Sequence, residues 1–174
     1  GEPHGVFNDW MGLVRGAVTY DKTDRALYYY YRVTEEAPWT RLNIHGSNDV
    51  FAGFSPEPGK IYVAHRMADE PTASMYLYDT VKQSFGPKYF GDPNFSMTSS
   101  ALDYDPQDGA IQGIRYINDG VAVHWTSSAM QKVQAKVDTK LPGRINQLAS
   151  SDFEQSRFIV ASSADRLPVR YYLY

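Results

Sequence analysis

Short runs of alternating apolar and polar residues fill most of the chain, and turns rich in Asp, Ser, Pro or Gly separate them. Alternation with a period of two predicts β-strands, and Pro, Gly and Asp between two such runs predict hairpin turns. The order strand, turn, strand, aromatic-containing strand recurs four times. The turns of the four copies are 21–24, 55–59, 105–109 and 151–154.

The spacing of these copies is close to that of propeller blades, which are four-stranded sheets of about 40–50 residues. The sequence therefore predicts an all-β fold, a partial β-propeller of about three to four blades of antiparallel strands. A β-sandwich is the alternative, because its strands also alternate with turns, but the fourfold order favours the propeller. The predicted strands are 16–20, 26–31 and 39–42; 50–54, 61–64 and 75–79; 100–104, 110–114 and 121–125; and 145–149, 157–161 and 170–174.

One segment departs from the two-residue period and predicts a single inserted amphipathic helix at about 128–141. Apolar residues recur there at spacings of three and four, the helical period. Ser127 or Ser128 can cap its start, and Pro142-Gly143 ends it. We expect the apolar stripe to dock on its own blade rather than on a partner domain. Its members are Met130, Val133, Val137 and Leu141.

We expect residues 1–174 to form a single partial propeller domain. The chain ends at Leu173-Tyr174, inside the predicted third strand of the fourth copy. An incomplete sheet leaves an unpaired edge, which can pair with another chain. We therefore expect a truncated domain that self-associates through open sheet edges. The blade-like repeats are expected at about 16–45, 48–92, 98–143 and 144–174.

Composition strengthens the β prediction and narrows the classes of partner. The 14 Tyr, 8 Phe and 3 Trp favour pleated, half-buried strands. A net charge of −3 gives no electrostatic footprint for nucleic acid or an anionic membrane. No apolar run approaches the roughly 20 residues that span a bilayer. From the charge and the apolar runs together, we expect neither nucleic acid nor a membrane as a partner. Without cysteine there is no disulfide, thiolate metal site or cysteine nucleophile.

Several segments together resemble the propeller domain of the prolyl oligopeptidase family, closest to its acylaminoacyl-peptidase-like branch. In that branch a blade ends in a His-Trp strand, followed by a helix and a Leu-Pro-Gly-Arg turn. The resemblance covers most of the chain from about Ala17 onward. The segments that carry it are Gly113–Tyr116, Val123–Trp125, Met130–Leu141, Pro142–Arg144, Ile159–Asp165 and Tyr171–Tyr174, with Phe54–Pro56 and Met75–Asp79 as weaker signatures.

The resemblance implies a non-catalytic role as part of a lid. In such serine peptidases the propeller precedes an α/β-hydrolase domain that holds Ser, Asp and His, and it restricts entry to short or N-acylated peptides. The implied partners are that hydrolase domain and short peptides. No Gly-x-Ser-x-Gly occurs in the chain, so the nucleophile elbow is absent and no catalytic residue is assigned. The alternative is a stand-alone propeller-like interaction module without activity, and the compartment, cytoplasmic or periplasmic, stays open.

The candidate catalytic and metal-ligating residues are scattered. Histidine occurs at four separated positions, which excludes a His-x-x-x-His zinc motif on a helix. A Ser-His-Asp triad is defined by geometry rather than spacing, but without an elbow we expect these residues to make turns and caps. We therefore expect no metal site and no cofactor, and a structural role for His124 beside Trp125. The four histidines are His4, His45, His65 and His124.

Three further motifs have ordinary structural explanations. The segment Asp103–Gly109 resembles a calcium loop, but Asp108 and Ile114 occupy the positions that require Gly and Glu, so a hairpin turn is predicted. In a strand, Tyr28–Tyr31 presents two rings to each face, which favours packing over ligand stacking. Asn94-Phe95-Ser96 matches a glycosylation acceptor, a motif that is common by chance.

Overall fold

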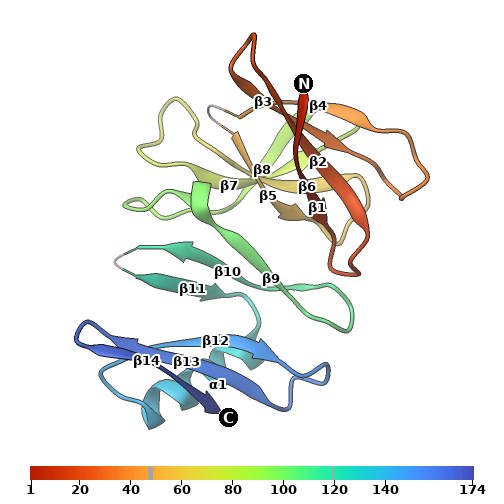
Figure 1. Ribbon diagram of the computed structural model, residues 1–174. Coiled ribbons are helices and arrows are strands. Elements are labelled where there is room, and N and C mark those ends of the chain that lie inside the picture. The colour runs from red at the N-terminus through yellow and green to blue at the C-terminus, as the bar shows by residue number, and fades with distance from the viewer. Residues whose placement is uncertain (47–48, 119) are drawn as a thin grey trace. The chain divides into compact units, whose positions relative to one another are not determined.

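The computed structural model describes residues 1–46, 49–118 and 120–174 and confirms the prediction of an all-β fold with one inserted helix (Figure 1). The strands form four antiparallel sheets of three or four strands, as expected for part of a propeller. The chain divides into two compact units. The first unit is Gly1–Leu102 and the second unit is Asp103–Tyr174.

The first unit begins with a four-stranded antiparallel sheet in which each strand pairs with the next along the chain. Side chains alternate between its faces. Val18 lies opposite Tyr29 and both are buried, whereas the next pair, Thr19 and Tyr28, belongs to the other face. The tyrosine run of β3 therefore supplies buried rings to only one face. The strands are β1 (Glu2–Asn8), β2 (Val14–Asp21), β3 (Ala26–Tyr31) and β4 (Thr40–His45).

A second sheet in the same unit repeats this up-and-down order. Its second strand is buried from Ile61 to Ala64, because both of its faces are covered. The short 3₁₀ helix η1 (Met97–Ser99) contributes the fully buried Met97 and contacts three of the four strands. The strands are β5 (Asp49–Phe54), β6 (Lys60–His65), β7 (Ser74–Asp79) and β8 (Ser84–Phe90).

The two sheets of the first unit share one hydrophobic core. Phe7 of β1 stacks on Phe51 of β5, with ring centroids 4.5 Å apart, and Phe51 meets Phe54 edge-on at 5.0 Å. Offset and edge-on aromatic pairs stabilise a core beyond the area they bury. The buried members of the core are Val18, Tyr29, Tyr31, Leu42, Ile44, Phe54, Ile61, Val63 and Tyr78.

An aspartate begins three of the hairpin turns in the same way. The Asp21 carboxylate accepts the amide protons of Thr23 and Asp24, and the first of these bonds lowers the pKa of Asp21. Asp79 and Asp105 accept amide protons at equivalent places. The residue four positions after each aspartate has a positive φ, which favours glycine. These residues are Arg25 (φ 52°), Gln83 (φ 53°) and Gly109 (φ 73°).

Replacing Arg25 with glycine is expected to stabilise the first unit. A left-handed backbone strains any residue with a Cβ, so Arg25→Gly should raise the free energy of unfolding by about 0.5–1 kcal/mol. Thr23→Gly is the matched control in the same turn. It should lower stability, because it adds freedom to the unfolded chain without relieving strain. Urea denaturation measures both, and a loss of stability in Arg25→Gly would contradict the expectation.

From β9 onward the chain forms two three-stranded antiparallel sheets, joined by a helix. Gly113 lies opposite Trp125 in the first of them, and a Cβ on Gly113 would come within 2.7 Å of the indole ring. Glycine therefore leaves the space that the Trp125 indole occupies beside β10. The strands are β9 (Ala101–Tyr104), β10 (Ile111–Ile117), β11 (Val121–Trp125), β12 (Ile145–Ser151), β13 (Phe158–Ala164) and β14 (Leu167–Leu173).

The helix α1 (Ser128–Lys140) covers part of the second unit's core. The side chain of Ser127 caps its start by accepting the amide proton of Met130, one of the two predicted caps. The apolar stripe packs on Trp125 of its own predicted blade, and also on strands β12 and β13 of the next one, so it covers more than its own blade. The buried members of this core are Trp125, Met130, Val137, Leu148, Phe158 and Val160, and the half-buried Val133 and Leu141 pack against them.

Two strands lie outside the predicted set, and both are edge strands. β1 contains Pro3 and Gly5 and is almost entirely exposed, so it has no apolar alternation. β8 contains Gly86-Pro87, residues that weaken strands and are tolerated at edges. The single domain over 1–174 and its blade boundaries stay predictions, and residue 48, the expected start of the second blade, lies outside the described residues.

Candidate functional site

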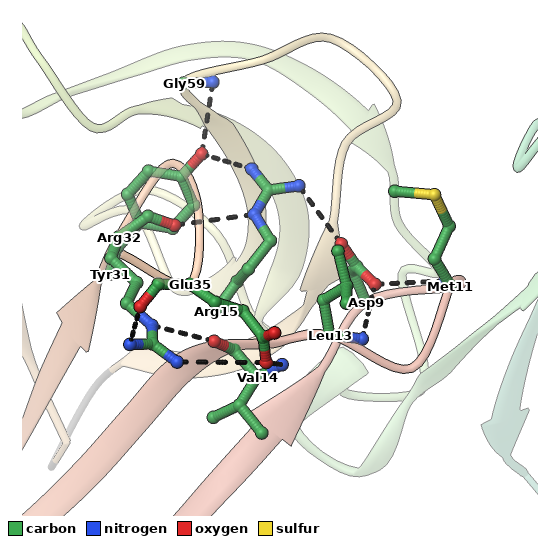
Figure 2. Close-up of polar contacts among 9 residues, drawn as sticks. All are labelled: Asp9, Met11, Leu13, Val14, Arg15, Tyr31, Arg32, Glu35 and Gly59. Carbon is green, nitrogen blue, oxygen red and sulfur yellow. Dashed lines mark hydrogen bonds and ion pairs between the residues drawn. The ribbon is translucent and has the colours of Figure 1, made fainter. Parts of the chain in front are cut away.

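A buried ion pair lies where the hairpin between β1 and β2 meets β3 (Figure 2). The Asp9 side chain is completely buried. Its Oδ1 accepts the amide protons of Met11 and Leu13, both at 3.0 Å, and so fixes the turn after β1. Its Oδ2 lies 3.3 Å from Nη1 of Arg15. Because removing a carboxylate from water is costly, these three partners are what make a charged Asp9 acceptable here.

The guanidinium of Arg15 connects this turn to the second sheet. Its Nη2 donates to the Tyr31 hydroxyl at 2.6 Å, and the same hydroxyl accepts the amide proton of Gly59 at 3.2 Å. The group also lies 5.4 Å from the Tyr31 ring centroid and 5.5 Å from that of Phe54. Asp9 neutralises its charge at the same time. Arg15 therefore acts as a brace between β2, β3 and the turn between β5 and β6.

A second arginine shapes the connection between β3 and β4. Arg32 donates from Nε to the carbonyl oxygen of Val14 at 2.8 Å and from Nη1 to the carbonyl oxygen of Glu35. The Glu35 carboxylate accepts the amide proton of Val14 at 3.1 Å. The Arg32 guanidinium also lies 4.5 Å from the ring centroid of Trp39. These contacts, most of them drawn in Figure 2, tie residues 32–39 to the start of β2.

This braced connection forms one wall of a cavity of about 660 Å³ within the first unit. The volume lies in the range of small-molecule sites, and the mix of apolar walls and a few polar groups is typical of them. The turns after β5 and β7 also line it. Lining residues include Tyr31, Arg32, Val33 and Pro38 from β3 and the segment after it, and Gly59 and Val81 from the two turns.

An Asp-His pair links neighbouring strands of the second sheet. Asp49 of β5 lies opposite His65 of β6, with Oδ1 2.5 Å from the ring Nδ1, and its Oδ2 accepts the amide proton of His45 at 2.6 Å. The His65 ring stacks on Phe85 at a centroid distance of 4.3 Å. A carboxylate at Nδ1 orients a histidine as in a general base. The next strand places Ser74 opposite His65.

The row Asp49, His65 and Ser74 has the residue types of a catalytic triad but not its contacts. Among the described residues no hydroxyl is hydrogen-bonded to the His65 ring. Ser74 is buried, and a Cβ on Gly91 would lie 2.4 Å from its hydroxyl oxygen, so the serine packs against that backbone. Sequence spacing gives no signal for this row, because only the strand register brings the three residues together.

A third charged cluster lies beside β7 and β8. Glu70 forms an ion pair with Lys88, and the hydrogen bond between them lowers the pKa of Glu70 and raises the pKa of Lys88. Burial is the main cause that raises the pKa of the neighbouring Tyr76. Lys88 is half exposed, so the pair contributes little to stability.

The histidines singled out from the sequence lie on different strands. His4 of β1 approaches Tyr20 at 6.4 Å between ring centroids, and His124 lies in β11. Within residues 1–46, 49–118 and 120–174, no group of three or more His, Asp or Glu side chains is placed to hold a metal ion. Of these four residues, His45 and His65 are the two that share a partner, Asp49.

The other singled-out motifs form turns and packing. Asp103–Gly109 includes the turn between β9 and β10, in which Asp105 accepts the amide proton of Gln107. Tyr29 and Tyr31 are buried in the first core, whereas the Tyr28 hydroxyl donates to Asp24 at 2.5 Å. Asn94–Ser96 precedes η1, and Ser96 caps that helix.

Comparison with protein-family models, with curated proteins and with solved structures finds no match to this chain. In the described part of the chain, α1 is too short and too polar to cross a membrane.

Proposed function

We propose that this chain is a non-catalytic β-propeller segment that forms part of the lid of a prolyl-oligopeptidase-like serine peptidase. The observation that supports it is topological. The sheets β1–β4 and β5–β8 follow each other along the chain, and each is a four-stranded antiparallel meander, the arrangement of a propeller blade. The resemblance of the segments from Gly113 to Tyr174 to the same family agrees with this role.

The chemistry of the described sites suits a scaffold rather than a catalyst. Arg15 is held by Asp9 and Tyr31, and His65 is held between Asp49 and Phe85. Side chains that their neighbours hold in place and shield from solvent in this way stabilise the surrounding strands. A lid of this kind excludes folded proteins from an active site and admits short or N-acylated peptides.

The test is to extend the reading frame of the source gene and to assay the intact product. We expect an α/β-hydrolase domain with a Gly-x-Ser-x-Gly elbow and cleavage of short N-acylated peptides, with folded proteins left intact. Replacing the elbow serine by alanine should abolish cleavage, which attributes it to that domain. A frame without a hydrolase domain, or an intact product that does not cleave short peptides, would overturn the proposal.

A stand-alone interaction module is the second candidate, and the 660 Å³ cavity in the first unit favours it. The two candidates differ in their behaviour in solution. A propeller segment with open sheet edges should self-associate, whereas a complete module should be monomeric and unfold cooperatively. Light scattering across micromolar concentrations distinguishes them, because a constant monomeric mass supports the module and counts against the segment.

A further inference from the structure

The sheet of β12, β13 and β14 has one covered face and one open face. α1 packs against the covered face, where Leu148, Phe158 and Val160 belong to the second unit's core (Figure 1). Side chains alternate along a strand, so the residues between these lie on the opposite face, which we call the open face. Its strand residues are Ile145 and Gln147 of β12, Ile159, Ala161 and Ser163 of β13, and Val169, Tyr171 and Leu173 of β14.

The open face is apolar and large for a surface in contact with water. Tyr171 and Leu173 are 71% and 74% exposed. Ile145, Ile159 and Val169 are exposed as well. Together these five residues expose on the order of 500 Å², which is toward the upper end for the largest apolar patch of a monomer. Contiguous patches of this size mark interaction surfaces, because their exposure to water is unfavourable.

The charges around the open face suit an apolar partner and do not oppose a second copy. The eight side chains of the face, on strands that the structure describes throughout, are uncharged. Arg157 precedes β13, and Asp165 and Arg166 follow it, so charges lie beyond both ends of the central strand. An uncharged centre with a polar border is typical of protein interfaces. Residues 103–174 hold eight Asp or Glu and eight Lys or Arg, so the second unit has no net charge to repel its copy.

The open face combines large and small side chains in a way that fits a copy of itself. Tyr171 and Leu173 project from β14, whereas the central strand β13 carries the small Ala161 and Ser163 beside them. These small residues leave room above β13 for a side chain of a partner. In a two-fold dimer the same patch meets itself, so Tyr171 of each copy can pack over Ala161 of the other.

The edge of this sheet is less suited to pairing with another chain. β14 is an outer strand, and its pairing with β13 is irregular between Ser162 and Ala164. Pro168 has no amide proton to donate, and the exposed Arg170 adds a charge to the same strand. Proline, charge and bulges are the features by which natural edge strands avoid pairing. A partner is therefore expected on the open face rather than along this edge.

We propose that the open face is the contact between two copies of this chain, which pack face to face as a two-fold dimer. Sheets packed in this way lie about 10 Å apart with interdigitated side chains. The two open faces bury about 1,000 Å² in total, close to the smallest specific interfaces, so we expect a Kd of about 10 μM. The inference uses the surface of the second unit alone. The lid function is decided by the reading frame, so the two proposals can fail separately.

Sedimentation velocity of the whole chain from about 1 to 100 μM measures the dimer. Tyr171→Lys places a charge in the contact and should raise the Kd at least about 100-fold. Leu173→Asn makes the contact polar without a charge and should raise the Kd at least about fivefold. Val81→Lys is the matched control, because Val81 is an equally exposed apolar residue of the first unit, and it should leave the Kd unchanged.

Thermal unfolding at a concentration that keeps the chain monomeric shows whether the variants fold. Tyr171 and Leu173 are mostly exposed in the monomer, so both variants should keep the Tm of the unsubstituted chain. If Tyr171→Lys lowers the Tm, Leu173→Asn decides in the same way. A chain that stays monomeric up to about 100 μM overturns the proposal and leaves the open face to a different partner, such as another β-sheet. A dimer that persists in a folded Tyr171→Lys variant also overturns it, because the contact then lies at a sheet edge or elsewhere.

Discussion

Replacing Tyr78 with alanine should lower the free energy of unfolding of the first unit by about 3–5 kcal/mol. The side chain is completely buried in the core shared by the two sheets. Its ring meets Phe85 edge-on at 5.1 Å, and its hydroxyl donates to Oε1 of Gln83 at 3.0 Å. Burial also raises the pKa of Tyr78, because the ionised oxygen would lose its water. Alanine removes all these contacts and leaves a cavity that rigid strands cannot fill.

Tyr78→Phe is the matched control, because it keeps the ring and removes the hydroxyl. It should lower the free energy of unfolding by only about 1 kcal/mol, because Oε1 of Gln83 still accepts the amide proton of Asn43. Hydrogen exchange of peptides from each unit during urea denaturation measures both changes. A loss of less than about 1 kcal/mol in Tyr78→Ala would mean that the two sheets do not share a tightly packed core.

The central strands were predictable because each carries its own signal. β3 and β6 are rich in Tyr, Val and Ile and lie between turn residues, and α1 has a clear spacing of three and four. β1 and β8 were missed because their neighbours, not their own residues, make them strands. An edge strand needs hydrogen-bonding partners on one side only, so Gly and Pro are tolerated there.

The candidate sites were less predictable than the strands, since each depends on contacts between distant residues. Asp49 and His65 meet only because β5 and β6 pair in one register. Asp9 and Arg15 are close in sequence, but the partner that completes their cluster, Tyr31, comes from another strand. A buried aspartate after a strand is a common turn former, so its burial with an arginine has no signature in the sequence.

Replacing Asp9 with alanine should destabilise the first unit by about 3–5 kcal/mol, because it leaves the guanidinium of Arg15 shielded and unpaired. The amides of Met11 and Leu13 lose their acceptor in the same change. Asp9→Asn keeps an oxygen for these amides but removes the charge. It should therefore lower the free energy of unfolding less than Asp9→Ala does. The difference between the two variants measures what the hydrogen bonds within the turn contribute. Urea denaturation gives all three free energies of unfolding.

The double substitution Asp9→Asn with Arg15→Met tests whether the ion pair itself stabilises the unit. A buried pair replaced by uncharged groups of similar volume is often neutral, because the cost of desolvating two charges disappears. The double variant should therefore be more stable than Asp9→Asn alone. If it is less stable instead, the bond from Arg15 to Tyr31 carries the stabilisation. Arg15 would then brace the two sheets through its hydrogen bond rather than its charge.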